Sequence, residues 1–221
     1  MSRSVADFVA ERFGHQPRDV ALFEAAVTHS STRDVDYERL EFLGDRVLGL
    51  SIARWLYERF PNEPEGKLSQ RFNTLVDRAT CGEIGRGIGL PDVIRVGKQA
   101  REDGASSSDN VVGDVVEAVM GAIFLEAGLE TAEQIIRRLW QPLVDEQRSA
   151  PKHPKSALQE FAAARSLPNP HYEVVDRSGA QHLPQFTIRV SLPGHGDAEA
   201  QGTSKQEAET EAAKALLEKL R

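Results

Sequence analysis

The segment 111–125 (VVGDVVEAVMGAIFL) limits the possible folds more than any other part of the chain. Its only charged side chains are Asp114 and Glu117, and apolar residues surround both of them. A spacing of three residues places the two carboxylates on one face of a helix, and Gly121 on that face allows a second helix to approach closely. An unpaired buried carboxylate is costly, and no Lys or Arg lies within one turn of this pair in the sequence. The segment therefore predicts a buried helix in a helical domain, with a counter-charge supplied from elsewhere.

The segment 37–56 (YERLEFLGDRVLGLSIARWL) predicts a second helix with clustered acids. Glu38, Glu41 and Asp45 share one face of this helix, opposite a stripe of apolar residues. Acids in this arrangement usually face solvent, but the same face continues with Leu48 and Ile52 in the following turns. A helix that is apolar on both faces lies centrally in a domain or at a subunit contact. We therefore expect a cation among these acids.

Acids at this spacing on two facing helices are the way in which carboxylate metal sites are built in helical folds. Oxygen ligands with neither His nor Cys beside them favour Mg²⁺ or Mn²⁺ over Zn²⁺ or Cu²⁺. Such an ion suits the hydrolysis of phosphate esters, because it activates a water and neutralises charge on the scissile phosphate. From the residues alone we predict a divalent-metal site, the alternative being acids that simply face solvent.

The sequence pattern changes at QRSAPKHP (147–154), where two prolines and small polar residues interrupt the helical periodicity. We predict an all-α domain over 1–147, a linker over 148–154 and an α+β domain over 155–221. The expected helices of the first domain are 4–13, 19–28, 36–59, 66–79, 80–87, 110–127 and 130–147, with a polar loop at 98–110. The second domain reads α-β-β-β-α, with a helix at 156–165, strands at 171–176, 185–192 and near 197–202, a turn at 177–179 and a helix at 205–220.

Charge and cysteine content bound the function classes. The net charge of −7 argues against a nucleic-acid partner when taken alone, but residues 151–221 have nine basic and nine acidic side chains, so the excess acid lies in the first 150 residues. The single cysteine, Cys81, excludes an internal disulfide, fits a reducing cytoplasm and is expected in the core. No apolar run reaches the roughly 18 residues that suggest a membrane span.

The start of the last helix, in GTSKQEAETEAAKALLEKL (202–220), predicts a phosphate-binding site. Ser204 can cap this helix with Glu207 completing a capping box, and Lys205 adds a positive charge to the free N–H groups. Other polar side chains that could contact RNA are Lys155, Gln159, Glu160 and His182. Exposed aromatic pairs that would stack on unpaired bases are not evident, which favours duplex over single-stranded RNA.

Residues 1–147 resemble the endonuclease domain of the ribonuclease III family, and residues 152–221 resemble a double-stranded-RNA-binding domain in the same order as in the bacterial enzymes. The matching stretches are AVTHSS (26–31), ERLEFLGDRVL (38–48), GDVVEAVMGAIFLEAG (113–128), PKSALQEF (154–161) and the run that begins with GTSK (202–205). They extend over nearly the whole chain.

The resemblance implies a cytoplasmic, homodimeric endonuclease that cuts both strands of RNA duplexes with Mg²⁺, or with Mn²⁺ as a substitute. It also implies staggered ends with 5′-phosphate and 3′-hydroxyl groups, the processing of ribosomal, transfer and structured messenger RNA precursors, and no nucleotide cofactor or membrane partner. The positions that match the family's metal ligands are Glu41, Asp45, Asp114 and Glu117, and those that match its catalytic acids are Asp45, Glu117, Glu38 and Glu65. Whether Asp45 is a ligand or positions the water stays open, as does the choice between one metal ion and two.

The chain departs from the family pattern at two positions, and two other functions are open to it. Ala200 and Gln206 stand where the family's tail usually has Gly and Lys, which predicts weaker RNA binding by the second domain. The first alternative function is that of a non-catalytic duplex-RNA-binding chaperone or ribosome factor. The second is a helical dimer in which the metal has only a structural role.

Overall fold

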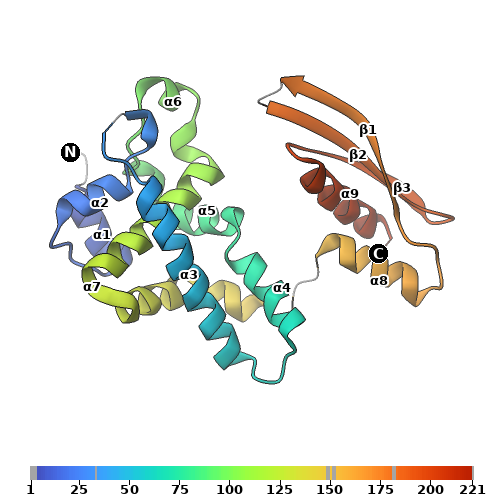
Figure 1. Cartoon of the computed structure of the whole chain (residues 1–221), viewed down its shortest axis with the longest axis horizontal. Helices are drawn as coiled ribbons and strands as arrows, with labels where there is room; N and C mark the ends of the chain where they lie inside the picture. The colour runs from blue at the N-terminus through green and yellow to red at the C-terminus, as the bar shows by residue number, and fades with distance from the viewer. Residues whose placement is uncertain (1–3, 33, 148–149, 151–152, 181–182, 221) are drawn as a thin grey trace. The chain divides into compact units, whose positions relative to one another are not determined.

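The computed structural model describes residues 4–32, 34–147, 150, 153–180 and 183–220. The chain forms two compact units, Met1–Pro151 and Lys152–Arg221 (Figure 1). The first unit is helical and the second combines helices with a sheet, which confirms the predicted fold class. The predicted linker lies partly outside the described residues.

The described part of the first unit consists of α-helices joined by short connections and 3₁₀ turns (Figure 1). The helices are α1 (Val5–Phe13), α2 (Val20–Ala26), α3 (Glu38–Arg59), α4 (Glu65–Leu75), α5 (Arg78–Gly87), α6 (Lys98–Glu102) and α7 (Asp109–Glu146). The 3₁₀ turns are η1 (Ser30–Thr32), η2 (Leu90–Asp92) and η3 (Ala105–Ser107). The predicted loop at 98–110 is therefore wrong in part, because it contains α6 and η3 and ends in the first residues of α7.

Local chemistry explains where several helices begin and bend. Ser108 caps α7 by accepting a hydrogen bond from the N–H of Val111, and Asp77 caps α5 in the same way. Asp77 therefore ends the predicted helix 66–79 early, so that α5 begins at Arg78. The two predicted helices at 110–127 and 130–147 form one element with a break at Gly128, whose φ of 81° favours glycine.

The core of the first unit is built around the crossing of α3 and α7, which form its most extensive helix contact. Two glycines bring the backbones together at this crossing. A Cβ atom on Gly44 would lie 1.7 Å from the carbonyl oxygen of Glu117, and one on Gly121 would lie 2.4 Å from that of Leu40. The expected close approach at Gly121 is therefore confirmed, and it places the first turns of α3 against the first half of α7.

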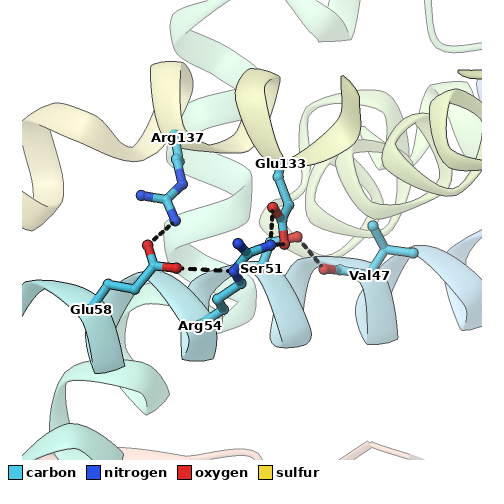
Figure 2. A network of polar contacts seen from close by, with 6 residues as sticks. All are labelled: Val47, Ser51, Arg54, Glu58, Glu133 and Arg137. Carbon is cyan, nitrogen blue, oxygen red and sulfur yellow. Dashed lines mark hydrogen bonds and ion pairs between the residues drawn. The ribbon is translucent and has the colours of Figure 1, made fainter. Parts of the chain in front are cut away.

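The second half of α3 is attached to α7 by a chain of alternating charges (Figure 2). Arg54 donates to Glu58 of its own helix and to the buried carboxylate of Glu133 on α7, both at 3.0 Å, and Arg137 donates to Glu58 at 2.6 Å. Leu48 and Ile52 are buried as expected. This half of α3 thus packs apolar side chains into the core, and an ion-pair network also joins it to α7.

The second unit packs two helices on one antiparallel sheet. Its elements are α8 (Pro154–Ala164), β1 (His171–Ala180), β2 (Leu183–Leu192), β3 (Gly196–Gly202) and α9 (Lys205–Lys219), and the strand order is β1-β2-β3. The buried side chains of its core include Leu158, Ile188, Val190 and Leu216.

The turn predicted at 177–179 is wrong. Arg177 pairs with Phe186 and Gly179 with Pro184, so both strands continue through the polar stretch. The register shifts between Val174 and Asp176, and this bulge breaks the alternation on which the prediction relied. The connection between β1 and β2 lies outside the described residues.

Among the described residues, none of the helices combines the length and the apolar character that crossing a membrane requires.

Candidate active site and RNA interface

Three of the predicted metal ligands converge where α3 crosses α7. Glu41 of α3 and Asp114 and Glu117 of α7 each offer a carboxylate oxygen, and these oxygens lie within 4.8 Å of one another. Glu117 is buried, whereas Glu41 and Asp114 are half-buried. The contact between the two backbones at Gly44 and Gly121 is what allows carboxylates from both helices to meet.

Burial opposes the ionisation of all three carboxylates. Burial raises the pKa of Glu117 to about 8, and the negative charges of Asp45, Glu41 and Asp114 add to the effect. Burial also raises the pKa of Glu41 and that of Asp114, with further repulsion of Glu41 by Asp114 and Asp45. A cation at this position would favour the charged forms and reverse these shifts. The electrostatics therefore favour cation binding.

One oxygen of the Asp114 carboxylate has no hydrogen bond among the described residues. Asp114 Oδ2 accepts from Tyr37 Oη at 3.3 Å, whereas Asp114 Oδ1 is buried and has no hydrogen-bond partner among the described residues. Arg78 Nε lies 3.4 Å from Oδ1, as an ion pair without hydrogen-bond geometry. A buried acceptor in an all-oxygen group is what a hard divalent cation requires. The residues present fit such an ion.

Sequence reasoning missed Arg78 and Tyr37. The prediction found no basic residue near Asp114 along the chain, but α5 brings the Arg78 side chain to it from a distant position. Neither residue carries a local signal for this role, because periodicity describes one helix at a time. Cys81 is buried as expected, and its Sγ lies 3.9 Å from Glu117 Oε1.

The other predicted acids lie outside the three-carboxylate cluster. Asp45 is partly exposed and accepts from Arg46 at 2.6 Å, although its charge still acts on Glu117. Glu38 is exposed and lines a groove beside α2. Glu65 begins α4 and accepts from Ser69 Oγ at 2.6 Å. The roles of Asp45, Glu38 and Glu65 stay predictions.

The predicted phosphate site at the start of α9 has the expected cap. Ser204 Oγ accepts from the N–H of Glu207 at 3.1 Å. The Glu207 carboxylate accepts from the N–H of Thr203 at 2.7 Å, so the returning bond of the capping box goes to the residue before the cap. Lys205 is exposed beside this helix start, with its Nζ 3.8 Å from the Glu209 carboxylate.

The remaining RNA-binding candidates differ in how accessible they are. Lys155 Nζ lies 2.5 Å from Glu209 Oε2 and 5.1 Å from the ring centre of Tyr172, so an internal carboxylate already binds its charge. Gln159 and Glu160 are exposed on α8. His182 lies outside the described residues.

Comparisons with known proteins cover both units. The family model described as Ribonuclease-III-like matches residues 19–143, and the double-stranded RNA binding motif matches residues 154–220. The protein named Ribonuclease 3 in Zymomonas mobilis is 61% identical, covering 96% of this chain and 86% of its own length. The Ribonuclease 3 of Rhodopseudomonas palustris is 42% identical, covering 98% and 81% respectively.

A solved structure resembles the helical unit. The nuclease domain of ribonuclease III from Campylobacter jejuni, which is described as flexible in a region involved in dimer formation, has 33% identity and a TM-score of 0.60. The match covers 62% of this chain and 96% of that one.

Proposed function

Because the chain belongs to the ribonuclease III family and is a double-stranded-RNA endoribonuclease, we propose that its cleavage reaction depends on Mg²⁺ bound by Glu41, Asp114 and Glu117. The proposal rests on the convergence of these three carboxylates, together with a buried Asp114 oxygen that has no hydrogen-bond partner among the described residues. The products would carry 5′-phosphate and 3′-hydroxyl ends with a stagger between the strands. The substrates would be ribosomal, transfer and structured messenger RNA precursors in the cytoplasm.

Each residue of the site has a separate task in this proposal. When bound, Mg²⁺ supplies positive charge that activates water and offsets the charge developing on the scissile phosphate. Tyr37 holds Asp114 through Oδ2 and so leaves Oδ1 available. Asp45 lies one helical turn after Glu41 and its carboxylate is partly exposed, which suits orienting the attacking water or adding a ligand. Glu38 and Glu65 would act near the same cleft.

The chain offers an apolar face that suits a homodimer. Phe42 and Val35 are exposed, and a groove beside them is lined by Leu22, Leu40 and Leu125. An exposed apolar patch of this kind marks an interaction surface. The Campylobacter jejuni nuclease domain, which is described as having a region involved in dimer formation, supports a second copy as the occupant. Each subunit would then supply one acidic cluster.

The second unit would hold the duplex by its shape. Ser204 and Lys205 at the start of α9 would bind phosphate, and Gln159 and Glu160 on α8 would contact 2′-hydroxyl groups. In this arrangement, residues 1–147 cut the RNA, residues 155–221 bind it, and residues 148–154 link the two functions. No nucleotide cofactor would be needed.

The first experiment is the cleavage of a long end-labelled RNA duplex with Mg²⁺, with Ca²⁺ and with EDTA. We expect staggered products with Mg²⁺ only, and analysis of their ends should show 5′-phosphate. Binding under all three conditions without cleavage would refute the catalytic proposal and favour a non-catalytic duplex binder.

The second experiment compares two buried carboxylates of α7. Glu117→Gln should abolish cleavage and retain duplex binding, because it removes a metal ligand without changing the size of the side chain. Glu133→Gln is the matched control, since Glu133 is equally buried on the same helix but pairs with Arg54. Cleavage that survives in Glu117→Gln, or that is lost equally in both variants, would contradict the site assignment.

A further inference from the structure

A single carboxylate of the second unit lies between two lysines of the predicted RNA-binding set. Glu209 Oε2 is 2.5 Å from Lys155 Nζ on α8, and Glu209 Oε1 is 3.8 Å from Lys205 Nζ one turn earlier on α9. The Glu209 side chain is 15% exposed, compared with 31% for Lys155 and 62% for Lys205. The carboxylate is therefore held inside the unit by one lysine and lies beside the other, which faces solvent.

This arrangement places a negative charge next to a proposed phosphate site. Together Lys155, Glu209 and Lys205 have a net charge of one positive unit, where the two lysines alone would have two. A phosphate bound by Lys205 would lie within about 7 Å of the carboxylate, slightly less than the Debye length of roughly 8 Å at physiological salt, so the repulsion is weakened by screening but not removed.

We propose that Glu209 sets the RNA affinity of this unit by opposing phosphate binding at Lys205, while Lys155 holds the other oxygen of the Glu209 carboxylate. The two distances indicate which contact of Glu209 breaks when a phosphate binds. The short Lys155 contact can persist when a phosphate takes Lys205, because the longer Lys205 contact is the one that must be given up. Lys155 is then a positioning residue, and the proposal rests on the proposed phosphate site at Lys205.

Glu209→Gln should bind duplex RNA about 3- to 10-fold more tightly than the unchanged chain at 0.15 M salt, as expected from removing one like charge about 7 Å from a phosphate. The gain should shrink as salt rises, because screening weakens the repulsion. Glu211→Gln is the matched control. It removes the same charge from the same helix, but Glu211 pairs with Lys214, 3.8 Å away, and its affinity change should stay below about 2-fold.

Lys155 provides a second and opposite perturbation. Lys155→Gln should weaken RNA binding, because Glu209 loses its short ion pair and is free to engage Lys205 fully. In the Glu209→Gln background the same change should have little effect. A direct RNA contact by Lys155 would instead weaken binding equally in both backgrounds, and that result would overturn the positioning role.

The measurement is the fluorescence anisotropy of a labelled RNA duplex with the full-length chain in EDTA, which prevents cleavage. Circular dichroism confirms that each variant is folded.

Lys205→Gln tests the proposed phosphate site itself. It should weaken RNA binding and lower the slope of log affinity against log salt concentration by about 1. If Lys205→Gln binds RNA as tightly as the unchanged chain, the proposed phosphate site is refuted. Suppose instead that Lys205→Gln binds RNA more weakly, but Glu209→Gln gains no more RNA affinity than Glu211→Gln. That result would refute only the role of Glu209. If Glu209→Gln does not fold, unchanged or tighter RNA binding by Lys155→Gln still refutes the proposal.

Discussion

The contact between α3 and α7 can be tested at a single glycine, Gly44. A Cβ atom there would lie 1.7 Å from the Glu117 carbonyl oxygen, whereas ordinary contacts begin at 3.4 Å. Gly44→Ala therefore forces the two helices apart by roughly 1.5 Å at the crossing, because packed backbones have no free space to yield. Glu117 moves with its own carbonyl group, so the perturbation reaches the acidic cluster directly.

The expected cost follows from two opposing effects. Overpacking costs about 1–3 kcal/mol of the free energy of unfolding, and more where backbone rather than side chain must move. Replacing glycine by alanine within a helix returns up to about 1 kcal/mol. Because backbone must move here, the upper part of the first range applies, and we expect a net loss of stability of about 1–2 kcal/mol. Metal affinity should fall at least about 10-fold, since Mg²⁺ accepts little departure from octahedral geometry.

Gly49→Ala on the same helix is the control. Its added Cβ atom would lie 3.6 Å from Phe72 Cζ, an ordinary contact, so the helix propensity gain of up to about 1 kcal/mol should appear without the clash. Urea unfolding would measure stability, and isothermal titration calorimetry with Mn²⁺ would measure metal affinity. A Gly44→Ala variant as stable as Gly49→Ala, with unchanged Mn²⁺ affinity, would refute the argument that the glycine contact builds the site.

Two further predictions concern other parts of the chain. Thr203 donates hydrogen bonds to Glu207 and lowers its pKa, so this carboxylate stabilises the fold above its ordinary pKa of 4.5, and the contribution disappears as pH falls through the lowered value. Glu207→Gln should therefore cost about 0.5–1 kcal/mol at pH 7 in urea unfolding, and an equal cost at pH 3 would contradict this reasoning. Phe42→Glu should dissociate the proposed dimer in analytical ultracentrifugation, whereas Tyr57→Glu, also exposed on α3 but outside the groove, should leave it intact.

Much of the fold could be predicted because the relevant information is local. The periodicity of 37–56 and 111–125 defines helices whose acids share one face, and those helices are α3 and α7. The cap at Ser204 is also a local feature, since its partner is three residues away. Even so, a local bulge was enough to disguise the second half of β1, because the prediction identified strands by their alternation.

The sequence by itself determined which residues have the chemistry for metal and RNA binding, and that the helical part precedes an α+β part. Only the tertiary structure decided which of these residues meet. It brings Arg78 of α5 to Asp114 of α7, and Lys155 of α8 to Glu209 of α9. The physical reason is that sequence periodicity relates residues within one element, whereas a site between elements depends on how closely two backbones cross.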